Sequence, residues 1–208
     1  MNYELLISFV IATSALAISP GPDNIYVIMQ SIVHGKKYGI ATVCGLISGC
    51  LVHTTIVAFG VSVIIKENEW LFKSIKWLGA FYLCFLAFKV YKAPHTINLN
   101  DKTLVPKKTL GELFRQGFIM NVLNPKVSLF FLSFFPAFLF STSLNSVIQF
   151  YVLGLLFMIT SFIIFSGLAL LSGQISSYLL RDKHTGLILK WLQIIVFIAI
   201  AFYLVFDK

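Results

Sequence analysis

Charged side chains are scarce in this chain of 208 residues, at 12% of the composition, whereas hydrophobic residues make up 58%. A soluble domain carries roughly 25% charged residues, so this chain has too little polar surface to coat a water-soluble globule. The mean hydropathy of +0.90 agrees with that deficit. The composition therefore predicts an integral membrane protein.

Acidic residues are fewer still, with 8 Asp and Glu against 16 Lys and Arg, for a net charge of +8. The charges lie between apolar runs and not on one amphipathic face, so we expect no nucleic-acid partner. The positive-inside bias of membrane proteins explains the excess. Cysteines number only 3, and all lie in apolar stretches, so no structural disulfide is expected. The first residues, MNYE, lack the Lys or Arg of a secretory signal, and no cleaved signal peptide is expected.

Six apolar segments predict an all-α fold with six transmembrane helices, since a spanning helix requires about 20 residues. Lys73 and Lys76 lie near the start of the third segment, where long cationic side chains can reach the interface. The segments cover roughly residues 5–33, 40–65, 70–91, 114–140, 147–171 and 187–206.

The distribution of Lys and Arg predicts the orientation. The loops after the first, third and fifth segments hold eleven of the 16 basic residues, the other side holds four, and Lys126 lies inside a span. The positive-inside rule places the eleven in the cytoplasm, so both termini are predicted to face outward.

The chain divides into two related halves. The hydrophilic stretch 93–112 predicts a cytoplasmic linker between three-helix repeats at 1–92 and 113–208, within one membrane domain. The sequence TLGE, from Thr109 to Glu112, fits a capping box that begins the fourth helix. KWLGAFYLCFLAF in the third segment matches KWLQIIVFIAIAF in the sixth. Because each half has three helices, the halves would be inverted repeats, a common transporter plan.

Proline motifs predict breaks in the first and fourth helices. Pro20 lacks an amide proton, Gly21 permits unusual backbone shapes, and Pro22 suits the first position of a new helix. This predicts half-helices at about 5–18 and 22–33. In the fourth segment Asn124 is a good N-cap and Pro125 a good first residue, so a half-helix is expected at about 125–140.

The two breaks predict a binding site. Backbone groups freed at a break must be buried in protein or line a polar cavity. The positive ends of the two half-helices would converge there, which suits a carboxylate ligand. Asp23 and Lys126 are the only formal charges well inside spans. We expect them to form an ion pair or to alternate between each other and a substrate; the alternative is a static salt bridge.

Other polar residues inside the spans are candidates for the same site. His53 would act in a proton relay or the cavity, or hydrogen-bond between helices. Asn121, one turn before Asn124, would share the cavity or join two helices, and Asn24 is a ligand candidate. No metal site and no cofactor are expected. GLISG, from Gly45 to Gly49, predicts close helix approach within one molecule rather than a dimer seam.

Several motifs together resemble the lysine exporter (LysE/RhtB-type) translocators. They are SPGPDN, HGKKYG, the Gly-rich second helix and GFIMNVLNPKVSLFF, and the resemblance covers essentially the whole chain without departure in either break signature. It implies a bacterial inner-membrane exporter of amino acids or their derivatives, driven by the proton gradient. The family's substrates vary, so the resemblance does not identify the amino acid.

The sequence therefore predicts a secondary carrier with alternating access and no enzymatic activity. A zwitterionic amino acid would bind between the breaks, its carboxylate at helix amides and Lys126, its ammonium at Asp23. Protonation of Asp23 would couple proton uptake to release. Two alternatives remain: a metal-cation exporter of the same superfamily, which would need more hard ligands than Asp23 and His53, and a non-transporting assembly subunit. Oligomeric state is left open.

Overall fold

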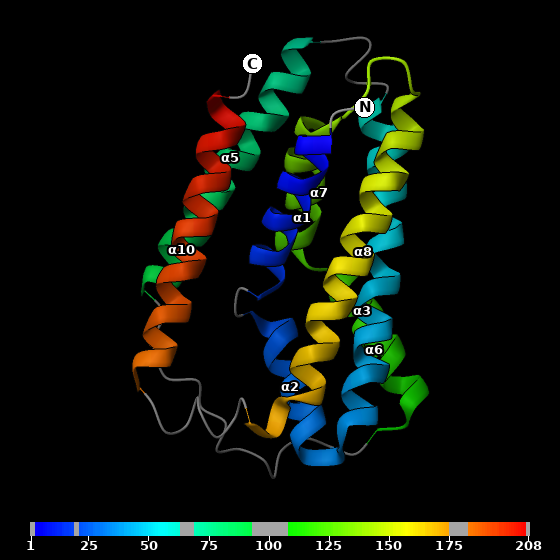
Figure 1. Ribbon diagram of the computed structural model, residues 1–208, viewed down its shortest axis with the longest axis vertical. Coiled ribbons are helices and arrows are strands. Elements are labelled where there is room, and N and C mark those ends of the chain that lie inside the picture. The colour runs from blue at the N-terminus through cyan, green and yellow to red at the C-terminus, as the bar shows by residue number, and fades with distance from the viewer. Residues whose placement is uncertain (1–2, 19–20, 63–68, 93–107, 175–182, 207–208) are drawn as a thin grey trace.

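The computed structural model describes residues 3–18, 21–62, 69–92, 108–174 and 183–206, and within these ranges every regular element is a helix. Figure 1 shows them as one elongated bundle. The elements are α1 (Tyr3–Ile18), α2 (Pro22–His34), α3 (Lys36–Ile56), the π-helical turn η1 (Val57–Val61), α5 (Glu69–Lys92), α6 (Leu110–Val122), α7 (Pro125–Phe134), the 3-10 turn η3 (Phe135–Phe138), α8 (Ser146–Leu170) and α10 (Lys183–Phe206).

Two helical stretches are long and apolar enough to cross a membrane, Lys36–Val61 and Ser146–Leu170. The pairs α1 with α2 and α6 with α7 also qualify if each bent pair is one span, with bends of 61° and 52°. The described residues thus contain two to four candidate spans. The predicted third and sixth spans correspond to the helices α5 and α10.

Both predicted helix breaks are present. Pro22 is the first residue of α2, preceded by Gly21 in an extended conformation; Pro20 lies outside the described residues. Pro125 is the first residue of α7, and the Asn124 side chain caps that helix by accepting the Lys126 amide at 3.0 Å. These residue types break and begin helices as they do in water. Proline acts through its own backbone, and Asn124 acts through a side-chain bond to an amide two residues away.

The half-helix after the second break is shorter than predicted. We expected it to continue to about residue 140, but α7 ends at Phe134 and is followed by η3 up to Phe138. Pro136 explains the difference, because a proline inside an α-helix has no amide hydrogen and its ring collides with the preceding turn. The hydropathy of this stretch does not indicate where the helix ends, because it reflects polarity and not backbone geometry.

The capping box at the start of α6 is confirmed. The Glu112 amide donates to Thr109 Oγ1 at 3.3 Å, and the Thr109 amide donates to Glu112 Oε2 at 2.7 Å. Both bonds satisfy amides that have no partner within the helix, which fixes the start of α6 at Leu110.

Helices from the two halves of the chain pack in pairs. The most extensive contacts are between α3 and α6 and between α5 and α10, and α1 packs on α8. The α3–α6 pair is especially close, because a Cβ added at Gly45 would overlap the Phe114 carbonyl, and one at Gly117 the Thr42 carbonyl. The predicted close approach at Gly45 and Gly49 is therefore confirmed as packing within one molecule.

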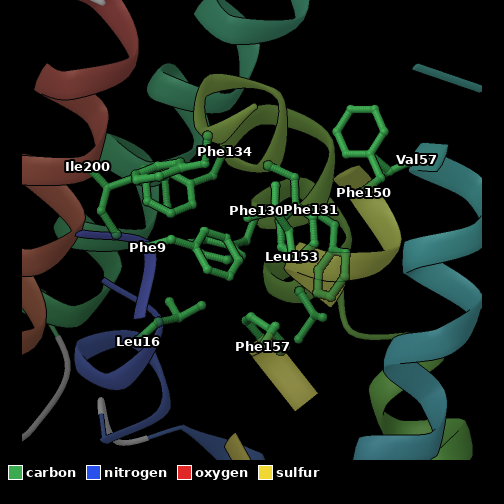
Figure 2. Packing of buried hydrophobic residues seen from close by; sticks show 14 of the residues in the cluster. Phe9, Leu16, Val57, Phe130, Phe131, Phe134, Phe150, Leu153, Phe157 and Ile200 are labelled. Carbon is green, nitrogen blue, oxygen red and sulfur yellow. The ribbon is translucent and has the colours of Figure 1, made fainter. Parts of the chain in front are cut away.

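Aromatic rings fill the space between α1 and α7, in the upper part of the bundle as drawn in Figure 1. Figure 2 shows Phe9 of α1 packed among phenylalanines of α7 and near Phe157 of α8. The Phe131 and Phe135 rings stack with centroids 4.0 Å apart, and Phe9 meets Phe135 edge-on at 5.1 Å. Such ring pairs stabilise the contacts between helices by van der Waals packing. This matters in a membrane, where lipid is as apolar as the side chains and gives no hydrophobic driving force.

The helices on either side of the two breaks occupy opposite halves of the bundle. In Figure 1, α1 and α7 lie in the upper half, and α2 and α6 lie in the lower half. The start of α1 and the end of α10 lie near the upper end of the view. The two breaks therefore fall at the middle of the bundle, which is where the candidate site lies.

Candidate functional site at the two helix breaks

The two breaks are joined directly by a hydrogen bond. Asn124 Nδ2 donates to Asp23 Oδ2 at 2.8 Å, between residues 101 positions apart in sequence. Asp23 is the second residue of α2, and Asn124 is the N-cap of α7. The amino-terminal ends of the two half-helices therefore meet, as predicted, and both present backbone amides and positive dipole ends to one region.

One carbonyl near the end of each preceding half-helix is bonded by a side chain of the protein. Asn24 Nδ2 donates to the Ala17 carbonyl at 2.8 Å, near the end of α1. His53 Nε2 lies 3.1 Å from the Asn121 carbonyl, near the end of α6. Because a carbonyl only accepts hydrogen bonds, Nε2 carries the proton in this contact. At each break, a side chain of another residue thus binds one of the carbonyl groups near the helix end.

The structure places Asp23 and Lys126 at one site but not in an ion pair. Between these two described side chains no ammonium–carboxylate contact within 4.0 Å is formed. The Lys126 ammonium instead lies 5.1 Å from the centre of the Phe197 ring of α10, while Asp23 accepts from Asn124. A cation over an aromatic face is stabilised by the ring's quadrupole, which partly offsets the cost of placing Lys126 at a helix amino terminus.

A small cavity lies between the breaks and the facing helices. The volume accessible to water-sized molecules is about 50 Å³, so the cavity can hold a few waters but not a whole amino acid. Six of the seven predicted binding residues line it, and His53 does not; Pro22 also lines it, and Pro125 does not. The break residues in the lining are Gly21, Pro22, Asp23, Asn24, Asn121, Asn124 and Lys126.

Sequence reasoning missed the opposite wall of the cavity. It is formed by α3, with Leu46, Ile47 and Cys50, and by α8, with Phe157, Ser161 and Phe165. The α8 residues repeat every four positions and so lie on one helix face. No sequence signal selects that face of α8, because the helix is apolar all round and its hydrophobic pattern has no preferred side.

Two buried polar atoms of cavity-lining residues have no hydrogen-bond partner. They are Asn121 Oδ1 and Ser161 Oγ, on side chains that are 5% and 1% exposed. A buried polar atom without a partner costs roughly 1–3 kcal/mol. These atoms are therefore candidates for contact with a bound molecule.

An all-helical membrane protein in which two broken helices enclose a charged cavity has the architecture of a small-molecule carrier. The chain belongs to the LysE type translocator family, whose family model matches residues 14–208. The resemblance seen in the break motifs is thereby confirmed.

Named efflux proteins are among its relatives. The chain is 27% identical over 184 residues to the homoserine/homoserine lactone efflux protein of Salmonella typhimurium, with 88% of each chain covered. It is 30% identical over 178 residues to the leucine efflux protein of Salmonella choleraesuis, covering 85% of this chain and 82% of that protein. No solved structure matches the chain.

Proposed function

We propose that this protein is a secondary carrier of the bacterial inner membrane that exports amino acids or their derivatives, coupled to protons. The observation that carries the proposal is the bond between Asn124 and Asp23, which brings two helix amino termini, a carboxylate and the Lys126 ammonium to one cavity. The names of the homoserine and leucine efflux relatives support an amino-acid substrate.

The two charges match the two charged groups of an amino acid. The substrate carboxylate would bind the amides at the starts of α2 and α7 together with Lys126, whose ammonium has an aromatic neighbour and, among the residues that the structure describes, no carboxylate within salt-bridge distance. The substrate ammonium would bind Asp23 in place of the Asn124 amide. Protonation of Asp23 would remove the negative charge that holds the ammonium, so proton uptake would favour release.

Transport requires the cavity to change size. At about 50 Å³ for water-sized molecules it does not accommodate an amino acid, so α2 and α7 would have to separate from the wall of α3 and α8 for loading. Opening first toward one side and then toward the other is alternating access, which inverted repeats perform by moving one half against the other.

The proposed carrier has six spans in two inverted repeats, residues 1–92 and 113–208, joined by the linker 93–112. The positive-inside rule would put the turn at Gly35 and the linker in the cytoplasm and both termini outside. The position of the α1 start and the α10 end at one end of the bundle supports this arrangement. Cysteine labelling of residues added at the termini, in intact and permeabilised cells, would test it.

Amino-acid efflux from exporter-deficient cells loaded with dipeptides tests the function. Asp23→Asn and Lys126→Met should each abolish accelerated efflux, while Lys89→Met, which removes an exposed charge outside the cavity, should not. Normal efflux in both site variants would contradict the assigned site. In proteoliposomes, efflux that is unaffected by collapse of both the pH gradient and the voltage would contradict proton coupling.

A further inference from the structure

One hydroxyl interrupts the apolar wall of the cavity that faces the helix breaks. On α8 this wall consists of Phe157, Ser161 and Phe165, which follow one another every four residues. Side chains at this spacing lie one above the other on a helix face, so the Ser161 Cβ points the same way as the two rings. The small side chain between two large ones leaves a notch in the wall.

The Ser161 hydroxyl is buried and unused within the part of the chain that the structure describes. Its side chain is 1% exposed, and Oγ has no hydrogen-bond partner. Some buried hydroxyls of the bundle bond to the carbonyl four residues earlier, as Ser31 does to Val27 at 2.8 Å and Thr54 to Cys50 at 2.9 Å. Thr13, Ser62 and Ser166 also have a hydroxyl without a partner, but Ser161 alone among these four lines the cavity. Ser161 lacks this bond, so its hydroxyl is left to bind something else.

We propose that Ser161 determines substrate specificity by hydrogen-bonding a polar group on the side chain of the exported amino acid. This rests on the proposed function, because it takes the cavity as the substrate site. With the amino and carboxylate groups held at Asp23 and Lys126, the side chain would extend toward the wall of α3 and α8.

The composition of that wall limits the side chains that fit. The lining residues Leu46, Ile47, Phe157 and Phe165 are apolar, and none of the lining residues of α3 and α8 carries a formal charge. A charged side chain would be buried there without a counter-charge, which is costly. A hydroxyl can donate and accept, so Ser161 suits a short, uncharged side chain that carries one hydrogen-bonding group.

Homoserine and norvaline test this because their side chains differ only by a hydroxyl in place of a methyl group. Binding is measured by thermal shift and by competition against radiolabelled homoserine on purified protein, and efflux of both amino acids is measured in loaded cells. The test variant is Ser161→Ala, which keeps the notch and removes the hydroxyl. The matched control is Ser166→Ala, on a second buried α8 hydroxyl without a partner that does not line the cavity.

The wild-type protein should prefer homoserine, and Ser161→Ala should reduce that preference about tenfold, the effect of losing one buried hydrogen bond. Norvaline binding should change by less than about twofold, and Ser166→Ala should leave the preference intact. A wild type without preference, or equal losses for both ligands in Ser161→Ala, would overturn the proposal. Selective binding without any efflux would instead refute the transport function and leave the Ser161 contact standing.

Discussion

Asn124 has two structural roles that substitution can separate. Its Oδ1 accepts the Lys126 amide at 3.0 Å and caps α7, and its Nδ2 donates to Asp23 at 2.8 Å. Loss of an N-cap costs about 1 kcal/mol. Side-chain hydrogen bonds between membrane helices average about 0.6 kcal/mol and reach about 1.7 kcal/mol. A carboxylate acceptor places the Asp23 bond near the upper value, so Asn124→Ala should lower the unfolding free energy by about 2.5 kcal/mol.

Two further variants divide that loss. Asn124→Ser retains a capping oxygen but cannot donate from an amide nitrogen to Asp23, so it should lose only about 1.5 kcal/mol. Asn145→Ala is the matched control, because Asn145 caps α8 by accepting the Val147 amide at 2.9 Å and is exposed. Because Asn145 forms no bond across a helix break, Asn145→Ala should lower the unfolding free energy by only about 1 kcal/mol.

Equilibrium unfolding in mixed micelles, followed by circular dichroism, measures these free energies. A double-mutant cycle between Asp23→Ala and Asn124→Ala should give a coupling of about 1.5 kcal/mol. The reasoning fails if Asn124→Ala costs no more than Asn145→Ala, or if the coupling is below about 0.5 kcal/mol. In either case the bond seen between the two breaks does not hold them together.

The same unfolding measurement tests three other features. Gly45→Val should cost about 2–3 kcal/mol because its side chain would overlap the α6 backbone, whereas Gly111→Ala, with no atom within 4 Å of the added carbon, should be neutral or stabilising. A stable Gly45→Val protein would contradict the close packing of α3 and α6. Gln149→Leu should cost about 2–3 kcal/mol, because its amide bonds the backbone of the 140–144 turn at four points; an unchanged midpoint would show that the turn does not need it. Thr109→Ala should lose about 1 kcal/mol with the capping box, and no loss would indicate that α6 begins independently of it.

The helix breaks could be predicted because the residues that cause them act locally. Proline has no amide hydrogen, and the Asn124 and Thr109 side chains bond amides two or three residues away. Such effects depend on neighbours in sequence and not on the rest of the fold. Pro136 is an equally local signal: the α-helix ends at Phe134 and becomes a 3-10 turn, although the stretch up to residue 140 stays apolar.

The partners of the charged residues could not be predicted in the same way. Opposite charge suggested a bond between Asp23 and Lys126, but Asp23 accepts from Asn124 and Lys126 lies over Phe197. Both choices depend on how α10 and α7 pack, which no local pattern specifies. For His53 the sequence left two roles open, a proton relay or cavity role and a hydrogen bond between helices, and the structure shows a bond of the second kind, to the Asn121 carbonyl near the end of α6.

The pairing of helices across the two halves sets an order for assembly during synthesis. α3 takes its main partner, α6, from the second half of the chain, and α5 likewise takes α10. The glycine face of α3 at Gly45 therefore remains without its protein neighbour until residues beyond the linker have entered the membrane. The N-terminal half cannot complete its packing while it emerges from the ribosome. A chain stopped after Lys92 would be a target for membrane quality control, and co-expression of residues 93–208 as a separate fragment should protect it.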